Sequence, residues 1–197
     1  MDPIADYLAA AYPEPTTLLG QRLRPFSLGH MEMLTRFRNA YVTSGGVPSL
    51  DDLSFGVFVC CQTWREGQDA LEAGDLPVKL KAWGRKLPPF DFETKSEAFV
   101  RYLLDGSTPP QTMQEEGGGE STGVSLLQDV RLVLCGELGY TREAAMDCPW
   151  GLALWDYYGC HARHGHVRLV GRELAEHLEW AEQVNSRLKG ERREVLN

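Results

Sequence analysis

The chain has 197 residues, of which 43% are hydrophobic and 24% charged, the proportions of an ordinary soluble globular protein. Its 28 Asp and Glu residues outnumber its 20 Lys and Arg residues, so the net charge is −8 with histidine neutral. This sign argues against binding to nucleic acid or to an anionic membrane surface, because clustered cations bind phosphate groups.

The N-terminus and the cysteines bear on localisation. Asp2, Pro3 and Asp6 stand where a signal peptide would have its basic region and apolar run. No uninterrupted apolar span of about eighteen residues occurs, so we expect no transmembrane helix. The five cysteines form no regular framework, and Cys60 and Cys61 are adjacent. Free thiols in a reducing compartment explain this pattern, so we expect a cytoplasmic protein.

The N-terminal part predicts helices separated by short breaks. A helix over residues 4–12 is halted by Pro13, and residues 16–26 are predicted to form a short extended segment. Ser27 is in a position to cap the next helix through its side-chain oxygen. The apolar side of that helix is expected to include Phe37.

A second group of helices follows the break over residues 45–48. Ser49 is predicted to start a helix, because acidic residues follow it and apolar residues then recur at a helical period. Its apolar stripe is expected to consist of Leu50, Leu53, Val57, Cys61 and Trp64. Further helices are predicted over residues 76–87 and 93–104.

Residues 106–123 differ from the rest of the chain in composition. They are polar and contain no aromatic or β-branched aliphatic residue that could anchor them to a core. Such a segment cannot offset its ordering entropy, so we predict a flexible linker or mobile loop. It separates an N-terminal helical block, residues 1–105, from a C-terminal helical block, residues 124–197. The sequence leaves open whether these two blocks pack as one domain.

The C-terminal block also predicts helices. Residues 124–138 are apolar nearly all round, which indicates a helix buried on most sides. Thr141 is in a position to cap a short helix, and Asp147 to cap a longer one with Pro149 in its first turn. One face of the longer helix is formed by Trp150, Leu154, Tyr157 and His161. A last amphipathic helix is predicted over residues 170–188. The expected fold class is therefore mainly α, an irregular helical bundle with little or no β-structure.

Catalytic motifs are missing from the sequence. It contains no phosphate-binding loop, no dinucleotide-binding glycine motif and no nucleophile elbow. His30 is interpreted as a packing residue at a helix start rather than as a catalyst. Zinc-type ligands do cluster in one place, at Cys160, His161, His164 and His166. A structural zinc site usually recruits a second pair of ligands, which this sequence lacks. We therefore expect no metal and no cofactor, and a polar helix end explains the cluster.

Aromatic residues suggest a docking surface on the longer helix. If the face that carries Trp150 points to the core, then Trp155 and Tyr158 project elsewhere, beside Asp156. An exposed aromatic pair next to a carboxylate suits binding to a helical partner protein. Trp155, Tyr158 and Asp156 are therefore the predicted partner-binding residues. Replacing Trp155 with alanine is expected to weaken that binding without unfolding the protein.

Two patches of the sequence carry a resemblance to a known family. The first, residues 23–34, reads Leu-Arg-Pro-Phe-Ser-Leu-Gly-His-Met-Glu-Met-Leu. The second, residues 139–149, reads Gly-Tyr-Thr-Arg-Glu-Ala-Ala-Met-Asp-Cys-Pro and leads to Ala-Leu-Trp at residues 153–155. Both patches resemble bacteriophage tail assembly chaperones and their prophage-encoded relatives. Cys148, which intervenes between Asp147 and Pro149, departs from the family pattern.

The resemblance implies a non-enzymatic helical protein made during phage assembly. Such a protein binds the long helical tape-measure protein and keeps its apolar surface from aggregating, and it can form a homo-oligomer. Two alternatives stay open: a structural virion subunit of the tail or connector, and a small helical metal-binding enzyme that uses the cluster of Cys160 to His166. A gene directly before a very long coiled-coil-rich reading frame would favour the chaperone.

Overall fold

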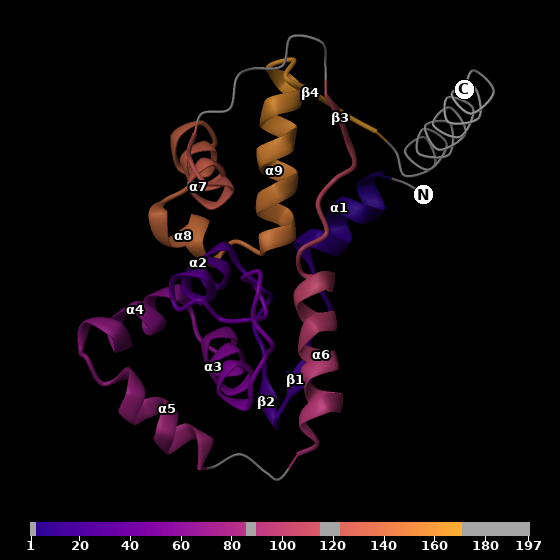
Figure 1. Ribbon diagram of the computed structural model, residues 1–197. Coiled ribbons are helices and arrows are strands. Elements are labelled where there is room, and N and C mark those ends of the chain that lie inside the picture. Colours follow the sequence, from indigo (N-terminus) through magenta and orange to yellow (C-terminus); the bar gives the residue numbers. More distant parts are fainter. Residues whose placement is uncertain (1–2, 86–89, 115–122, 171–197) are drawn as a thin grey trace, which may run out of the picture.

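The computed structural model describes residues 3–85, 90–114 and 123–170. Over these ranges the protein is mainly α-helical, as predicted, with two short antiparallel sheets (Figure 1). The elements are α1 (Pro3–Ala11), β1 (Thr17–Leu18), β2 (Gln21–Arg22), α2 (Leu28–Arg36), α3 (Leu50–Cys60), α4 (Trp64–Glu72), α5 (Leu76–Gly84), α6 (Phe92–Asp105), β3 (Thr112–Gln114), α7 (Leu126–Gly136), α8 (Arg142–Asp147), α9 (Trp150–Arg163) and β4 (Val167–Leu169). The helix predicted over residues 170–188 lies outside the described residues, apart from its first residue.

Three helices begin where their capping residues predict. The side-chain oxygens of Ser27, Ser49 and Thr141 each accept the backbone N–H of the residue three positions further on. These contacts satisfy N–H groups that the first turn of a helix leaves without a partner. The starts of α2, α3 and α8 are therefore set by local sequence.

The expected apolar stripe from Leu50 to Trp64 is divided between two helices. α3 ends at Cys60, and α4 begins at Trp64 because Thr63 and Glu66 form a capping box there. Leu50 is 53% exposed, whereas Trp64 is buried. The prediction of a single stripe was wrong because a strong N-cap restarts the helix inside the repeat.

The extended segment predicted over residues 16–26 contains a two-stranded hairpin. β1 pairs with β2 around a two-residue turn in which Leu19 has φ 52° and Gly20 has φ 72°. Positive φ at both central positions matches the right-handed twist of the strands. Leucine adopts this backbone conformation at a cost, and burial of the Leu19 side chain offsets it.

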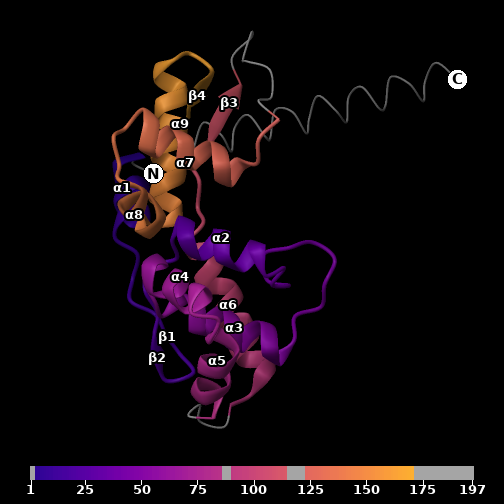
Figure 2. The same cartoon turned by 90° about the vertical axis from the view of Figure 1, so that its left-hand side faces the viewer.

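The two predicted helical blocks share one hydrophobic core. α1 packs against α9, and α2 contacts α7, α8 and α9, so helices from the two ends of the sequence lie side by side (Figures 1 and 2). The core cluster includes Leu28 and Leu34 from the first block together with Leu134, Met146 and Trp150 from the second. α1, from the start of the chain, therefore packs with the helices of the C-terminal block.

The predicted linker contains ordered backbone in its described part. β3 pairs antiparallel with β4, so that Thr112 lies opposite Leu169. Further back, the Gly106 carbonyl accepts the Gly151 N–H of α9 at 2.9 Å, and Pro110 is buried. Residues 106–114 thus lie beside α9 and pair with β4, and the mobility of the segment stays a prediction. Residues 115–122 lie outside the described ranges.

α7 is less buried than its apolar composition predicts. Val130, Val133 and Leu134 face the core, but Leu126 is 47% exposed and Leu132 53% exposed. The contacts of α7 are with α2, α8 and α9, which cover one side of the helix. Burial on most sides was therefore a wrong prediction.

Candidate functional site

The predicted partner-binding residues lie on α9 and are partly buried. The Trp155 ring packs edge-to-face against Tyr7 of α1, with ring centroids 6.0 Å apart and planes at 82°. The Tyr158 ring packs against its neighbour Tyr157, and Asp156 accepts the Tyr140 hydroxyl proton at 2.9 Å. Trp155 and Tyr158 are therefore not the fully exposed pair that the sequence predicts, because α1 covers this side of α9.

The contact between Tyr7 and Trp155 leads to a testable prediction. Edge-to-face aromatic pairs contribute about 1 kcal/mol beyond the area they bury. We expect Tyr7→Ala and Trp155→Ala to lower the free energy of unfolding by less in combination than the two single losses added together, with a coupling of about 1 kcal/mol. Urea unfolding of the four proteins measures this coupling. Strictly additive losses would mean that Trp155 is not engaged by α1 and is free to bind a partner.

The two patches that carry the family resemblance meet in the fold. The Trp150 N–H donates to the Phe26 carbonyl at 2.6 Å, and the Leu28 N–H donates to the Cys148 carbonyl at 3.1 Å. Together with the bridge between Ser27 and Pro149, these bonds tie the start of α2 to the start of α9. We call residues 26–30 and 146–150 the junction. The resemblance thus falls on a packing element of the fold.

Asp147 has a different role in the junction from the one predicted. Its carboxylate accepts the Trp64 N–H at 2.8 Å, at the start of α4. α9 has no side-chain cap and begins behind Pro149. The prediction that Asp147 caps α9 was wrong because the carboxylate satisfies the first turn of a helix that lies 83 residues away in sequence.

A glycine lets α2, α4 and α8 come close together at the junction. A Cβ on Gly29 would lie 2.7 Å from Cδ1 of Trp64 and 2.8 Å from the Met146 carbonyl oxygen, distances at which atoms clash. On the outer side, the Arg142 guanidinium lies over the Trp64 ring, 5.2 Å from its centroid. The tryptophan is thus enclosed between the glycine and the arginine.

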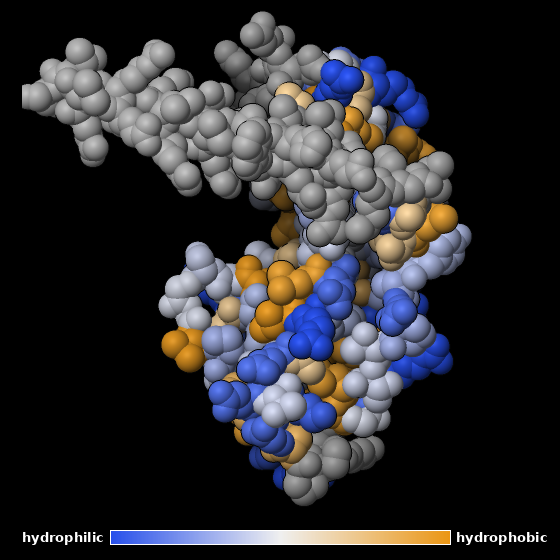
Figure 3. Space-filling model, turned by 90° about the vertical axis from the view of Figure 1, so that its right-hand side faces the viewer, coloured by the Kyte–Doolittle hydropathy of each residue, from blue (hydrophilic) through white to orange (hydrophobic). Residues whose placement is uncertain are grey.

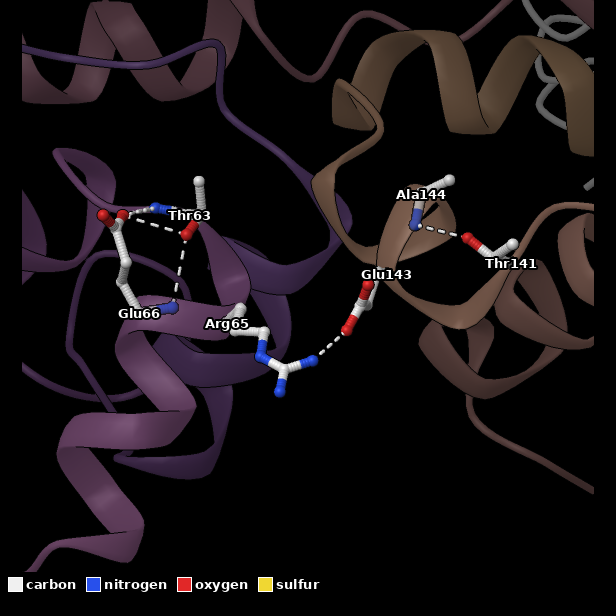
Figure 4. A network of polar contacts seen from close by, with 6 residues as sticks. All are labelled: Thr63, Arg65, Glu66, Thr141, Glu143 and Ala144. Atoms are coloured by element: carbon white, nitrogen blue, oxygen red, sulfur yellow. Dashed lines mark hydrogen bonds and ion pairs between the residues drawn. The ribbon is translucent and has the colours of Figure 1, made fainter.

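An ion pair on the surface links α4 to α8 beside the junction. Arg65 of α4 contacts Glu143 of α8, next to the capping contacts of Thr63 and Thr141 (Figure 4). Both charged side chains are more than half exposed. Solvent-exposed pairs of this kind contribute at most about 1 kcal/mol, so the buried contacts hold α4 against α8.

His30 has the packing role that the sequence predicts. Its Nδ1 accepts the Ser27 N–H at 3.1 Å, and its Nε2 donates to the Gln62 carbonyl at 2.8 Å. Burial lowers the pKa of His30 to about 4, because the charged imidazolium would lose its hydration. Both ring nitrogens are therefore satisfied in the neutral form.

A surface groove lies between α3 and α5 and has a volume of about 560 Å³. Its apolar wall is formed by Phe37, Phe55, Pro77 and Leu80. The rings of Phe37 and Phe55 lie 5.0 Å apart, and Phe37 is 44% exposed. Apolar periodicity predicts Phe37 on a buried side of the helix, but α2 ends at Arg36 and the Phe37 ring lines the groove. No sequence signal marked this groove, since three separate segments form it.

The zinc-type cluster lies at the C-terminal end of α9, where the structure adds the Glu137 carboxylate, which no sequence pattern indicates. Cys160 Sγ donates to Glu137 Oε2 at 2.9 Å, and His164 Nε2 lies 3.0 Å from the same oxygen. These hydrogen bonds lower the pKa of Glu137, and the carboxylate in turn raises the pKa of the Cys160 thiol. His161 packs against Tyr157 and does not join the three donors.

His166 also stays apart from the three donor residues. Its ring centroid is 6.2 Å from that of His164 and 5.6 Å from that of His161. The four residues predicted from the sequence are therefore only partly brought together, and Glu137 joins two of them.

No protein-family model matches the chain, and neither a curated protein nor a solved structure is similar to it. Along the described ranges, no helix combines the length and apolar character needed to cross a membrane. The groove and the α9 cluster are surface features of the described residues that suggest a binding activity.

Proposed function

We propose that the protein is a non-enzymatic binding protein that holds an amphipathic helix of a partner protein in the groove between α3 and α5. The observation that carries this proposal is the apolar wall of the groove, in which Phe37 and Phe55 present aromatic rings to solvent-accessible space. Aromatic side chains at such a position supply much of the binding energy in protein interfaces. A helix laid in a groove presents apolar residues at intervals of three and four to such a wall.

The rim of the groove suggests the charge of the partner. Asp51 and Asp52 line one side, and Lys81 lines the other. The whole chain is acidic, with a net charge of −8. A partner helix with one apolar face flanked by basic residues would be attracted to this rim, and opposite charges at a rim raise the rate of association.

The resemblance of residues 23–34 and 139–149 to phage tail assembly chaperones supports a particular partner. We infer that the partner is the long helical tape-measure protein, and that the chain keeps the apolar surface of that protein covered before assembly. Trp155, Tyr158 and Asp156 remain a predicted second contact region. Their use would require α1 to move off α9, because Tyr7 packs on Trp155.

The groove can be tested with one charged substitution and a matched control. Phe37→Glu places a carboxylate on the apolar wall, and we expect it to weaken binding about 30-fold, the equivalent of a 2 kcal/mol hot spot. Leu132→Glu is the control, because Leu132 of α7 is similarly exposed, at 53%, and lies outside the groove. The measurement is a calorimetric titration with synthetic amphipathic helices and with helical segments from any long coiled-coil-rich reading frame that adjoins the gene.

The titration has clear outcomes for the proposal. Loss of binding in Phe37→Glu alone, with both variants folded by circular dichroism, supports the groove. Equal binding by both variants and the parent excludes the groove as the docking site. Trp155→Ala in the same titration separates the two contact regions. If no such long reading frame adjoins the gene, the tape-measure assignment is contradicted, while the groove can still be tested with synthetic amphipathic helices.

A further inference from the structure

We propose that Glu137, Cys160 and His164 form a binding site for a zinc-class divalent metal ion. Their donor atoms, a carboxylate oxygen, a thiol sulfur and an imidazole nitrogen, all lie within 4.8 Å of one another. These are the three ligand types that zinc takes from proteins. The sequence alone predicts no metal, because no pattern in it places Glu137 beside Cys160.

The separations of the donors are close to those of a tetrahedral site. Metal–ligand distances of about 2.0–2.3 Å place two donors of a tetrahedral site about 3.3–3.6 Å apart. The Glu137 oxygen lies 2.9 Å from Cys160 Sγ and 3.0 Å from His164 Nε2, so a small outward shift of the carboxylate creates room for the ion. Glu137 and His164 are exposed, so both side chains are free to make that shift.

The elements that supply the donors hold them on one side of the fold. Glu137 is the C-terminal cap residue of α7, Cys160 lies in the last turn of α9, and His164 is the C-terminal cap residue of α9. α7 and α9 pack directly against each other. Cys160 is buried between them, so its sulfur has a fixed position while the other two donors approach from solvent. A bound ion would therefore link the ends of two helices.

The charge balance of the site suits a dication. The thiol of Cys160 loses its proton to solvent when a metal–sulfur bond forms, so a carboxylate and a thiolate neutralise the two positive charges. His164 binds as neutral imidazole. Three protein ligands leave a fourth position for water or another ligand, as in zinc sites that are not purely structural. Because a proton is released, binding tightens as the pH rises.

Titration of the purified full chain with Co²⁺ and Zn²⁺ tests the site. We expect one equivalent of Co²⁺ to give visible d–d bands and a near-ultraviolet charge-transfer band from the thiolate, and Zn²⁺ to displace it. Cys160→Ser should abolish the charge-transfer band. Cys135→Ser is the matched control, because Cys135 lies in α7 near the same helix end but outside the donor cluster.

A second variant protects the test against misfolding. Cys160 is buried, so its replacement can disturb the core, whereas the His164 side chain is 55% exposed. We expect His164→Ala to keep the parent circular dichroism spectrum and to weaken Zn²⁺ binding at least tenfold in competition with a chromophoric chelator. Binding that is unchanged in His164→Ala and Glu137→Gln, or a charge-transfer band that survives in Cys160→Ser, would overturn the proposal, as would parent protein that takes up no metal.

Discussion

Replacing Trp150 with alanine is expected to lower the free energy of unfolding by about 3–5 kcal/mol, the usual cost of removing a buried tryptophan side chain. Trp150 is 4% exposed and stands at the first position of α9, inside the junction. The loss combines the burial energy of the indole with the cavity left between α2 and α9. The backbone N–H of residue 150 can still donate to the Phe26 carbonyl in the variant. The loss of unfolding free energy therefore measures the packing of the indole side chain.

Urea unfolding followed by circular dichroism measures this loss. Trp83→Ala is a suitable control, because Trp83 of α5 is only partly buried and packs against Phe58, with ring centroids 5.8 Å apart. We expect the control to lose less stability than Trp150→Ala. A loss below about 0.5 kcal/mol for Trp150→Ala, the size typical of surface positions, would mean that the junction does not stabilise the fold as described.

Acidification is expected to destabilise the protein through His30. Its folded-state pKa of about 4 lies below the ordinary value of 6.5, so between these pH values the unfolded chain binds a proton that the folded protein does not. Stability therefore falls as the pH is lowered from about 6.5 to 4, in total by about 3 kcal/mol. Protonation of His30 Nδ1 would also break its hydrogen bond with the Ser27 N–H, because two donors would then face each other.

His30→Gln separates this effect from the titration of carboxylates. Glutamine at this position can still accept the Ser27 N–H in a capping box, but it does not titrate. Asp52, Glu66 and Glu137 also have lowered pKa values, so both proteins lose stability in acid. We expect the parent to lose about 3 kcal/mol more than His30→Gln between pH 6.5 and 4. Identical slopes in free energy of unfolding against pH would show that His30 is protonated in the folded state.

Local sequence signals predicted most of the helices. The predicted caps at Ser27, Ser49 and Thr141 are confirmed, because an N-cap needs only a short polar side chain and the N–H group three residues on. Apolar periodicity likewise predicted that Trp150 and Leu154 are buried. These features depend on a few neighbouring residues, which is why they can be read from one chain.

Features that depend on distant contacts were missed. Sequence spacing predicts Asp147 as the cap of α9, because nothing in it reveals that α4 begins beside the Asp147 carboxylate. The pairing of residues 112–114 with 167–169 also joins segments that are distant in sequence. The same holds for the contact between Glu137 and Cys160. The candidate groove was missed because the helix before it ends at Arg36, one residue earlier than the aromatic side chain that the periodicity assigned to the core.

The packing of α1 on α9 has a consequence for synthesis on the ribosome. About 140 residues separate the two helices, so at a translation rate of about 5–20 residues per second roughly 7–28 s pass between their appearance. During that interval the side of α1 that carries Tyr7 has no α9 to cover it. The nascent chain therefore exposes this side of α1 until α9 has been synthesised and can pack against it.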